Sequence, residues 1–316
     1  MKKPLIVLTG PTAVGKTKLS ISLAEAVNGE IISADSMQVY RNMDIGSAKI
    51  RPKEMQGVPH HLVDILSPQE EFHIVLFQKL AKNAMEEIYA KGRIPILVGG
   101  TGFYIQAVTR DIDFTQARQD DNCRKELEAL AARKGNKYLH EQLEKVDPKS
   151  AREIHANNVK RVIRALEFYR QNGMPISEHN EEQKERTTPY NLAYFVLNAP
   201  RDLLYERIDK RVDEMISEGL VNEVKKLKNM GCHKGMVSMQ GLGYKEILGY
   251  LDGEYSLEEA IRILKRDTRH FAKRQLTWFR REPDVTWVEK DQFDYNEEKI
   301  LGFMLDYCRK MGILPA

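Results

Sequence analysis

Apolar residues recur along the chain in two patterns, one with the length of buried strands and one with the spacing of helices. Between residues 16 and 27, Leu19, Leu23 and Ala26 share one helical face, and residues 77–92 form another helical segment that ends at a glycine. Three short apolar runs flank these helices, at 4–9 (PLIVLT), 30–35 (EIISAD) and 93–100 (RIPILVGG). Apolar strands that alternate with helices predict a parallel sheet covered on both faces.

The pattern changes between residues 116 and 189, where charged helical segments follow one another without a strand. A strand pattern returns at 190–198 (YNLAYFVLN), helices follow to about Arg281, and 285–289 (VTWVE) has the pattern of a last strand. A length of 316 residues agrees with about two domains. We therefore expect an α/β fold with a P-loop NTPase-like parallel sheet flanked by helices, formed by 1–115 and 190–316. Residues 116–189 are expected to form an all-helical insertion domain.

Composition narrows the class of protein only slightly. The chain has 49 Lys and Arg against 46 Asp and Glu, so its net charge of +3 does not by itself indicate nucleic acid. The three cysteines, Cys123, Cys232 and Cys308, form no CxxC pair, which favours a reducing compartment. No apolar run approaches the roughly 18 residues of a membrane span. We expect a cytoplasmic protein without a membrane segment.

The clearest motif is GPTAVGKT at positions 10–17, which follows a predicted strand and opens a predicted helix. It meets the pattern G-x-x-x-x-G-K-[ST], whose glycines turn backbone N–H groups toward an anion at a helix N-terminus. The expected diphosphate-binding residues are Gly10, Pro11, Thr12, Ala13, Val14, Gly15, Lys16 and Thr17. A hydroxyl at the last of these positions is suited to Mg²⁺, so Mg²⁺ is the expected cofactor, with Thr17 and Asp35 as its candidate ligands.

The motif does not say which molecule carries the phosphates. Asp35 ends the second predicted strand, where a nucleotide kinase would hold a metal ion. The strand that ends LVGG has no acid, and Thr101 is the polar group of the turn that follows it. This is a discrepancy with an ordinary NTPase and a first indication of a different use.

A basic stripe runs along residues 257–281. At about 100° per residue, apolar side chains share one side of a helix there, and basic ones share the opposite side. The basic residues are Arg262, Arg266, Arg269, Lys273 and Arg280. Residues 262–281 contain eight Arg and Lys but only one acid, Asp267. We therefore expect this face to contact a polyanion.

Taken in order, the motifs of the chain resemble those of bacterial tRNA dimethylallyltransferases, the IPP transferase family. The matching segments are GPTAVGKT, DSMQVYRNMDIGSAK, HHLVDI, LVGGTGFY, KRVIRALE, RIDKRVDEMISEGLVNEV, QGLGYKEI and TRHFAKRQLTWFR. They extend from position 10 to 280 and are far more specific than the P-loop alone. GSAK, where a threonine is usual, and Phe103, where leucine is common, are small departures outside the expected chemistry.

The resemblance implies transfer of a dimethylallyl group from dimethylallyl diphosphate to N6 of an adenine. That adenine lies 3′ of the anticodon in tRNAs that read codons beginning with U. Asp35 is the candidate base for the amine, which is a poor nucleophile because its lone pair is delocalised into the ring. Arg211, which shares a helical face with Arg207, is the expected diphosphate contact, and Thr101 is the third candidate catalytic residue.

The resemblance also implies a surface for the tRNA anticodon stem-loop. Its expected residues are Asp35, Ser36, Met37, Gln38, Thr101, Arg124, Lys160, Arg161, Arg164, Gln240, Gly243, Lys245, Arg266, Lys273, Arg274 and Arg280. The amides of Gln38 and Gln240 are suited to reading base edges. We expect the enzyme to act as a monomer.

Three alternatives stay open at this point. Prenyl transfer to free AMP would not need the basic helix. A small-molecule or nucleotide kinase would transfer the γ-phosphate of ATP. A non-catalytic RNA-binding P-loop protein would tolerate loss of Asp35. His60 and His61 point to opposite faces of a strand and have no third ligand spaced to help, so we expect a structural role for them.

Overall fold

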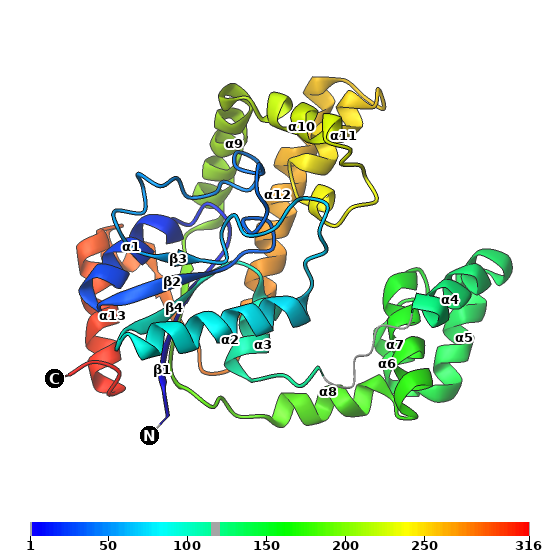
Figure 1. Cartoon of the computed structure of the whole chain (residues 1–316), viewed down its shortest axis with the longest axis horizontal. Helices are drawn as coiled ribbons and strands as arrows, with labels where there is room; N and C mark the ends of the chain where they lie inside the picture. Colours follow the sequence, from blue (N-terminus) through cyan, green and yellow to red (C-terminus); the bar gives the residue numbers. More distant parts are fainter. Residues whose placement is uncertain (1, 115–120, 316) are drawn as a thin grey trace. The chain divides into compact units, whose positions relative to one another are not determined.

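The computed structural model describes residues 2–114 and 121–315 (Figure 1). The chain divides into two compact units, one formed by the residues up to Thr109 and from Thr188 onward, the other by Arg110–Thr187. The expected boundary at 115/116 lies outside the described residues. The other expected boundary, at 189/190, falls next to the division at Thr187.

The first unit contains one sheet of six parallel strands in the order β3-β2-β4-β1-β5-β6. The strands are β1 (Pro4–Thr9), β2 (Gly29–Ala34), β3 (His60–His61), β4 (Ile94–Gly99), β5 (Asn191–Asn198) and β6 (Thr286–Glu289). Purely parallel sheets need helices on both faces, and the expected α/β class is confirmed.

Side chains alternate across β1 and divide the core of this unit into two layers. Leu5 and Val7 join the core beneath α2 (Ile74–Ala90), α3 (Gly102–Thr109), α10 (Leu220–Asn229), α11 (Tyr244–Leu251) and α12 (Leu257–Phe279). Ile6 and Leu8 join the opposite core beneath α1 (Lys16–Ala26) and α13 (Glu297–Lys310). The long helix α9 (Arg201–Glu218) contributes to both cores.

Helices are the only regular secondary structure among the described residues of the second unit, which has its own apolar core (green in Figure 1). Asp147 joins two of its helices, because its carboxylate accepts from the backbone N–H of Ser150 and of Ser177. The helices are α4 (Asp121–Lys134), α5 (Asn136–Val146), α6 (Pro148–Glu153), α7 (Val159–Asn172) and α8 (Ile176–Glu185).

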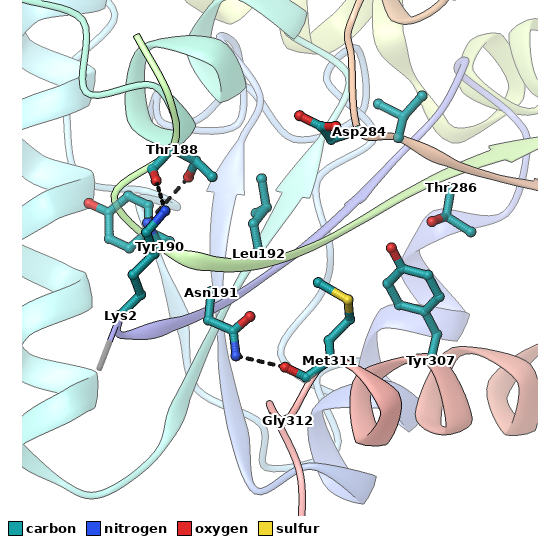
Figure 2. Close-up of a pocket in the computed structure, with 11 residues that line it drawn as sticks. Lys2, Thr188, Tyr190, Asn191, Leu192, Asp284, Thr286, Tyr307, Met311 and Gly312 are labelled. Carbon is teal, nitrogen blue, oxygen red and sulfur yellow. Dashed lines mark hydrogen bonds between the residues drawn. The ribbon is translucent and has the colours of Figure 1, made fainter.

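A cavity of about 770 Å³ lies at the amino-terminal edge of the sheet (Figure 2). Lys2, which precedes β1, helps to line it together with Asn191 and Thr286, the first residues of β5 and β6. Asn191 donates from Nδ2 to the carbonyl of Met311 there. None of the site residues expected from the sequence lines this cavity, and all those that follow a strand lie at the opposite edge.

Candidate active site

The register of three neighbouring strands brings the sequence motifs to one edge of the sheet. Thr9 pairs with Gly99, and Gly99 pairs with Ala34, so the residues that follow β1, β4 and β2 start side by side. The backbone of Gly99 approaches that of Ala34 too closely for a side chain, which explains glycine there. The P-loop, the Thr101 turn and Asp35 therefore share the carboxyl edge, where open parallel sheets bind ligands.

Gly15 and Lys16 fix the conformation of the P-loop. Gly15 takes a φ of 96° at the N-cap of α1, a left-handed conformation that favours glycine. Lys16 folds back over the loop and donates from Nζ to the carbonyl oxygens of Gly10 (3.0 Å) and Pro11 (2.9 Å). These neutral carbonyls are weak partners for an ammonium group, and a diphosphate would be a stronger one.

Lys16, Arg211 and Asp35 interact electrostatically. Burial and, to a smaller extent, the positive charge of Arg211 lower the pKa of Lys16 to about 8, although the carboxylate of Asp35 acts in the opposite direction. Burial also lowers the pKa of Arg211, again opposed by Asp35. The structure thus places two cations and one carboxylate together at the mouth of the P-loop.

Asp35 is oriented by the loop that follows β2. Its Oδ1 accepts from the backbone N–H of Met37 (2.8 Å) and, more weakly, of Gln38 (3.4 Å). All of its hydrogen bonds to described residues end on Oδ1, which leaves Oδ2 for a substrate amine. The backbone of Thr101 lies next to Asp35, since the N–H of Thr101 donates to the carbonyl of the preceding residue, Ala34 (3.3 Å).

The two arginines of α9 lie in different surroundings. Arg211 interacts with Asp35 and Lys16. The guanidinium of Arg207 lies 5.9 Å from the ring centroid of Tyr295, and its charge acts on Lys290. Of the two, Arg211 is therefore the one whose charge acts on Lys16 and Asp35.

The residues present suit a magnesium ion held mainly by substrate. Thr17 is exposed in the first turn of α1, and Asp35 is half-buried. Mg²⁺ commonly takes one or two protein oxygens together with phosphate oxygens and water. Among the described residues, no cluster of three or more His, Cys, Asp or Glu could hold a metal by itself. His61 instead contacts the buried carboxylate of Glu30 (2.7 Å).

Two segments that contain expected tRNA-contacting residues, DSMQ (35–38) and QGLGYK (240–245), pack against each other. A side chain on Gly241 would lie 2.6 Å from the sulfur of Met37, so the QGLGYK and DSMQ segments are in contact. Glu223 of α10 fixes the chain beyond DSMQ by accepting from the N–H groups of Asp44, Ile45 and Gly46 and from the Tyr244 hydroxyl. Gly243, with a φ of 90°, turns the chain into α11.

The two glutamines expected to read base edges already have protein partners. Gln38 accepts from the Ser33 hydroxyl (3.2 Å) and donates to the carbonyls of Ser47 and Ala48. Gln240 is exposed, but its amide donates to the carbonyl of Lys234. Each amide therefore already uses part of its hydrogen-bonding capacity within the protein. Ser36 is half-buried in the same loop as Gln38.

The first half of the basic stripe on α12 is paired with acids, and its contact with RNA stays a prediction. Arg262 forms a bidentate pair with Glu259, Arg266 pairs with Asp267, and Arg269 pairs with Asp209 of α9. Sequence spacing along one helix gave no sign of the acids supplied by α9. Lys245 has acidic neighbours as well, Glu246 and Asp267. The exposed cations with no ion pair to a described residue are Lys273, Arg274 and Arg280, with Arg281 just beyond.

The expected tRNA-contacting cations of the helical unit also divide into exposed ones and ones paired with an acid. Lys160 and Arg161 are exposed at the start of α7. Arg124 (3.2 Å) and Arg164 (3.6 Å) both pair with the buried carboxylate of Glu167. These two arginines are thus partly neutralised within the unit, whereas the first two cations are open to solvent.

The sequence reasoning missed two buried polar side chains that hold the P-loop. Gln275 of α12 bonds to the backbone of Thr12, and Lys290, after β6, donates to the carbonyl of Val14 (3.3 Å). A glutamine on the apolar face of a helix was the available signal for the first. No comparable signal marked the second, which lies 276 residues from its partner.

Comparison with known proteins agrees with this arrangement. The model of the family described as IPP transferase matches residues 38–282. The chain belongs to this family. Within it, the chain is 62% identical to the tRNA dimethylallyltransferase of Lachnoclostridium phytofermentans, over 94% of each chain. It is 51% identical to the tRNA dimethylallyltransferase of Acetivibrio thermocellus, over 98% of each.

Solved structures of IPP transferase relatives show the same fold. The tRNA isopentenylpyrophosphate transferase of Bacillus halodurans is 48% identical, with a TM-score of 0.74 over 98% of each chain. A eukaryotic dimethylallyltransferase acting on tRNA is 31% identical, with a TM-score of 0.83 over 98% of this chain and 80% of that one. The expected P-loop-like fold is confirmed. In the described part of the chain, no helix combines the length and apolar character that crossing a membrane requires.

Proposed function

We propose that the protein is a tRNA dimethylallyltransferase that transfers the dimethylallyl group of dimethylallyl diphosphate to N6 of the adenosine 3′ to the anticodon. Its substrates are tRNAs that read codons beginning with U, and diphosphate leaves. The observation that carries the proposal is the position of Asp35 beside Lys16 and Arg211 at the mouth of the P-loop. An acid that activates an amine and a cradle for a leaving diphosphate are then adjacent.

The leaving group determines what the cradle must do. As the carbon–oxygen bond breaks, negative charge grows on the diphosphate, and fixed donors aimed at it lower the barrier. The loop amides, Lys16 and Arg211 supply such donors. Mg²⁺ held by Thr17 and one oxygen of Asp35 would supply further positive charge to the same oxygens.

The nucleophile needs an acceptor for its proton, whereas the leaving group needs donors and positive charge. The N6 amine of adenine donates to the free Oδ2 of Asp35 and gives up a proton as its bond to carbon forms. Because Oδ1 is held by the backbone N–H of Met37, the second oxygen keeps a fixed direction. Thr101, whose backbone N–H bonds to the residue before Asp35, would bond the substrates on the same side.

Two sets of exposed cations would hold the tRNA. On α12 these are Lys273, Arg274 and Arg280, and in the helical unit they are Lys160 and Arg161. Phosphate contacts of this kind position the RNA without reading its sequence. The target adenine must leave its stack, at a cost of a few kcal/mol. We propose that the protein acts as a monomer.

The test is to incubate the protein with dimethylallyl-labelled donor, Mg²⁺ and unmodified tRNA, and to locate the label after nuclease digestion. We expect label on the adenosine next to the anticodon, and none when Asp35→Asn replaces the native protein. AMP and ATP serve as alternative substrates. Label on AMP alone, or phosphate transfer from ATP without prenyl transfer, would overturn the proposal.

A further inference from the structure

Gln275 is a polar residue on the buried side of α12, only 6% exposed, while its neighbours Lys273 and Arg274 face solvent. We propose that Gln275 is a positioning residue for the transfer reaction. It holds both the donor-binding loop and the turn that carries Thr101 in their working geometry. The inference rests on the proposed function and gives a role to a residue of the TRHFAKRQLTWFR segment that was not among the expected site residues.

The carboxamide of Gln275 uses both of its ends. Its Oε1 accepts from the backbone N–H of Thr12 in the P-loop, at 2.9 Å. Its Nε2 donates to the carbonyl of Gly100, also at 2.9 Å, in a buried bond. One side chain therefore joins the segments that follow β1 and β4, which carry the loop and Thr101. The requirement for one acceptor and one donor is met by an amide and by neither a carboxylate nor an apolar group.

The bond to Thr12 fixes a peptide plane of the loop. In a trans peptide the N–H and the preceding carbonyl point in opposite directions. With the N–H of Thr12 directed at Gln275, the carbonyl of Pro11 points the other way, where it accepts from Lys16 at 2.9 Å. Gln275 thus sets the position from which Lys16 engages the diphosphate.

The bond to Gly100 fixes the second segment. A side chain at this position would overlap Nε2 of Gln275, so the close approach requires glycine. Thr101 follows immediately, and its N–H donates to the carbonyl of Ala34, next to Asp35. A shift of this turn would therefore change the position of Thr101 relative to Asp35, the proposed base. Losing the carboxamide would therefore displace protein groups that contact each of the two substrates. The exposed cations of α12 would stay in place.

The test compares Gln275→Met with Gln78→Met by steady-state kinetics and by tRNA binding to the full chain. Gln78 is a matched control, since it is also buried and its amide donates to the backbone carbonyl of Ala107 (2.7 Å) away from the site. For Gln275→Met we expect the KM for dimethylallyl diphosphate to rise about tenfold and kcat to fall about tenfold, with the Kd for tRNA within twofold. For Gln78→Met we expect lower thermal stability but unchanged KM and kcat.

Gln275→Glu provides a second variant of the same shape. It keeps an acceptor for Thr12 but turns an oxygen toward the carbonyl of Gly100, so it should lose activity as well. Unchanged KM and kcat in either Gln275 variant, or equal kinetic losses in Gln78→Met, would overturn the inference. If the native protein itself transfers no prenyl group, the proposed function fails instead, and the native arm of the experiment reports that separately.

Discussion

Donor binding should weaken above pH 8 because Lys16 loses its charge there. In the free protein, burial together with the charge of Arg211 lowers the pKa of Lys16 to about 8. A bound diphosphate favours the charged form, so its binding raises this pKa again. Below pH 8 the ammonium is already present and binding is at full strength. Above pH 8 each binding event must also take up a proton, and affinity falls as pH rises.

The size of the effect follows from the pKa of the free protein. At pH 9.5, which is 1.5 units above a pKa of about 8, protonating Lys16 costs about 2 kcal/mol at about 1.4 kcal/mol per unit. This corresponds to an affinity about thirtyfold weaker than that of the protein with Lys16 fully protonated. Arg211 does not add to this trend, because a guanidinium stays charged over the range.

Calorimetric titration of dimethylallyl diphosphate without tRNA measures this directly and avoids the titration of RNA bases. Repeating it in buffers of different ionisation enthalpy should show uptake of nearly one proton per donor at pH 9. Lys16→Arg is the control, since its charge persists and its affinity should vary little with pH. A Kd for the native protein that stays flat from pH 7.5 to 9.5 would refute the reasoning, as would an equal slope in Lys16→Arg.

Three further predictions concern the surface, a loop contact and a thiol. Replacing both Lys273 and Arg274 by Ala should lower the slope of log K against log salt for tRNA binding by between about one and two. Arg262→Ala should change the slope little, because Arg262 is already paired with Glu259. Equal slopes for the native protein and the double variant would place this face away from the RNA. Gly46→Ala should cost about 1–3 kcal/mol of unfolding free energy in denaturant titration, because the new methyl lies 2.6 Å from the Tyr244 ring, and an unchanged midpoint would contradict this contact. The thiol of Cys308 is fully buried and burial raises its pKa to about 12, so it should resist maleimide at pH 8 until the protein unfolds; rapid native labelling would show otherwise.

The convergence of the site could be predicted because it depends on topology. Once the strands that precede Gly10, Asp35 and Gly100 are known to be parallel neighbours, their following loops must meet at one edge. The strand lengths and the glycines of the P-loop were visible as local patterns. The two-residue strand β3 was too short to produce such a pattern.

Interactions between distant elements could not be read from spacing. Arg269 is neutralised by Asp209, and Gly46 is bonded by Glu223, which lies 177 residues away. Such contacts depend on how α9 and α10 pack on the rest of the unit. The basic helix was therefore expected to carry more free charge than it does, and the buried contact of Gln275 with the P-loop was not expected at all.

The central claim is that the P-loop grips the leaving diphosphate of a prenyl donor next to the acid that activates an adenine amine. The most direct measurement is the ratio of diphosphate released to N6-dimethylallyladenosine formed in a single reaction with tRNA. The account predicts one diphosphate per modified adenosine, no diphosphate release without tRNA, and no replacement of the donor by ATP. Phosphate release from ATP with no prenylated adenosine would contradict it.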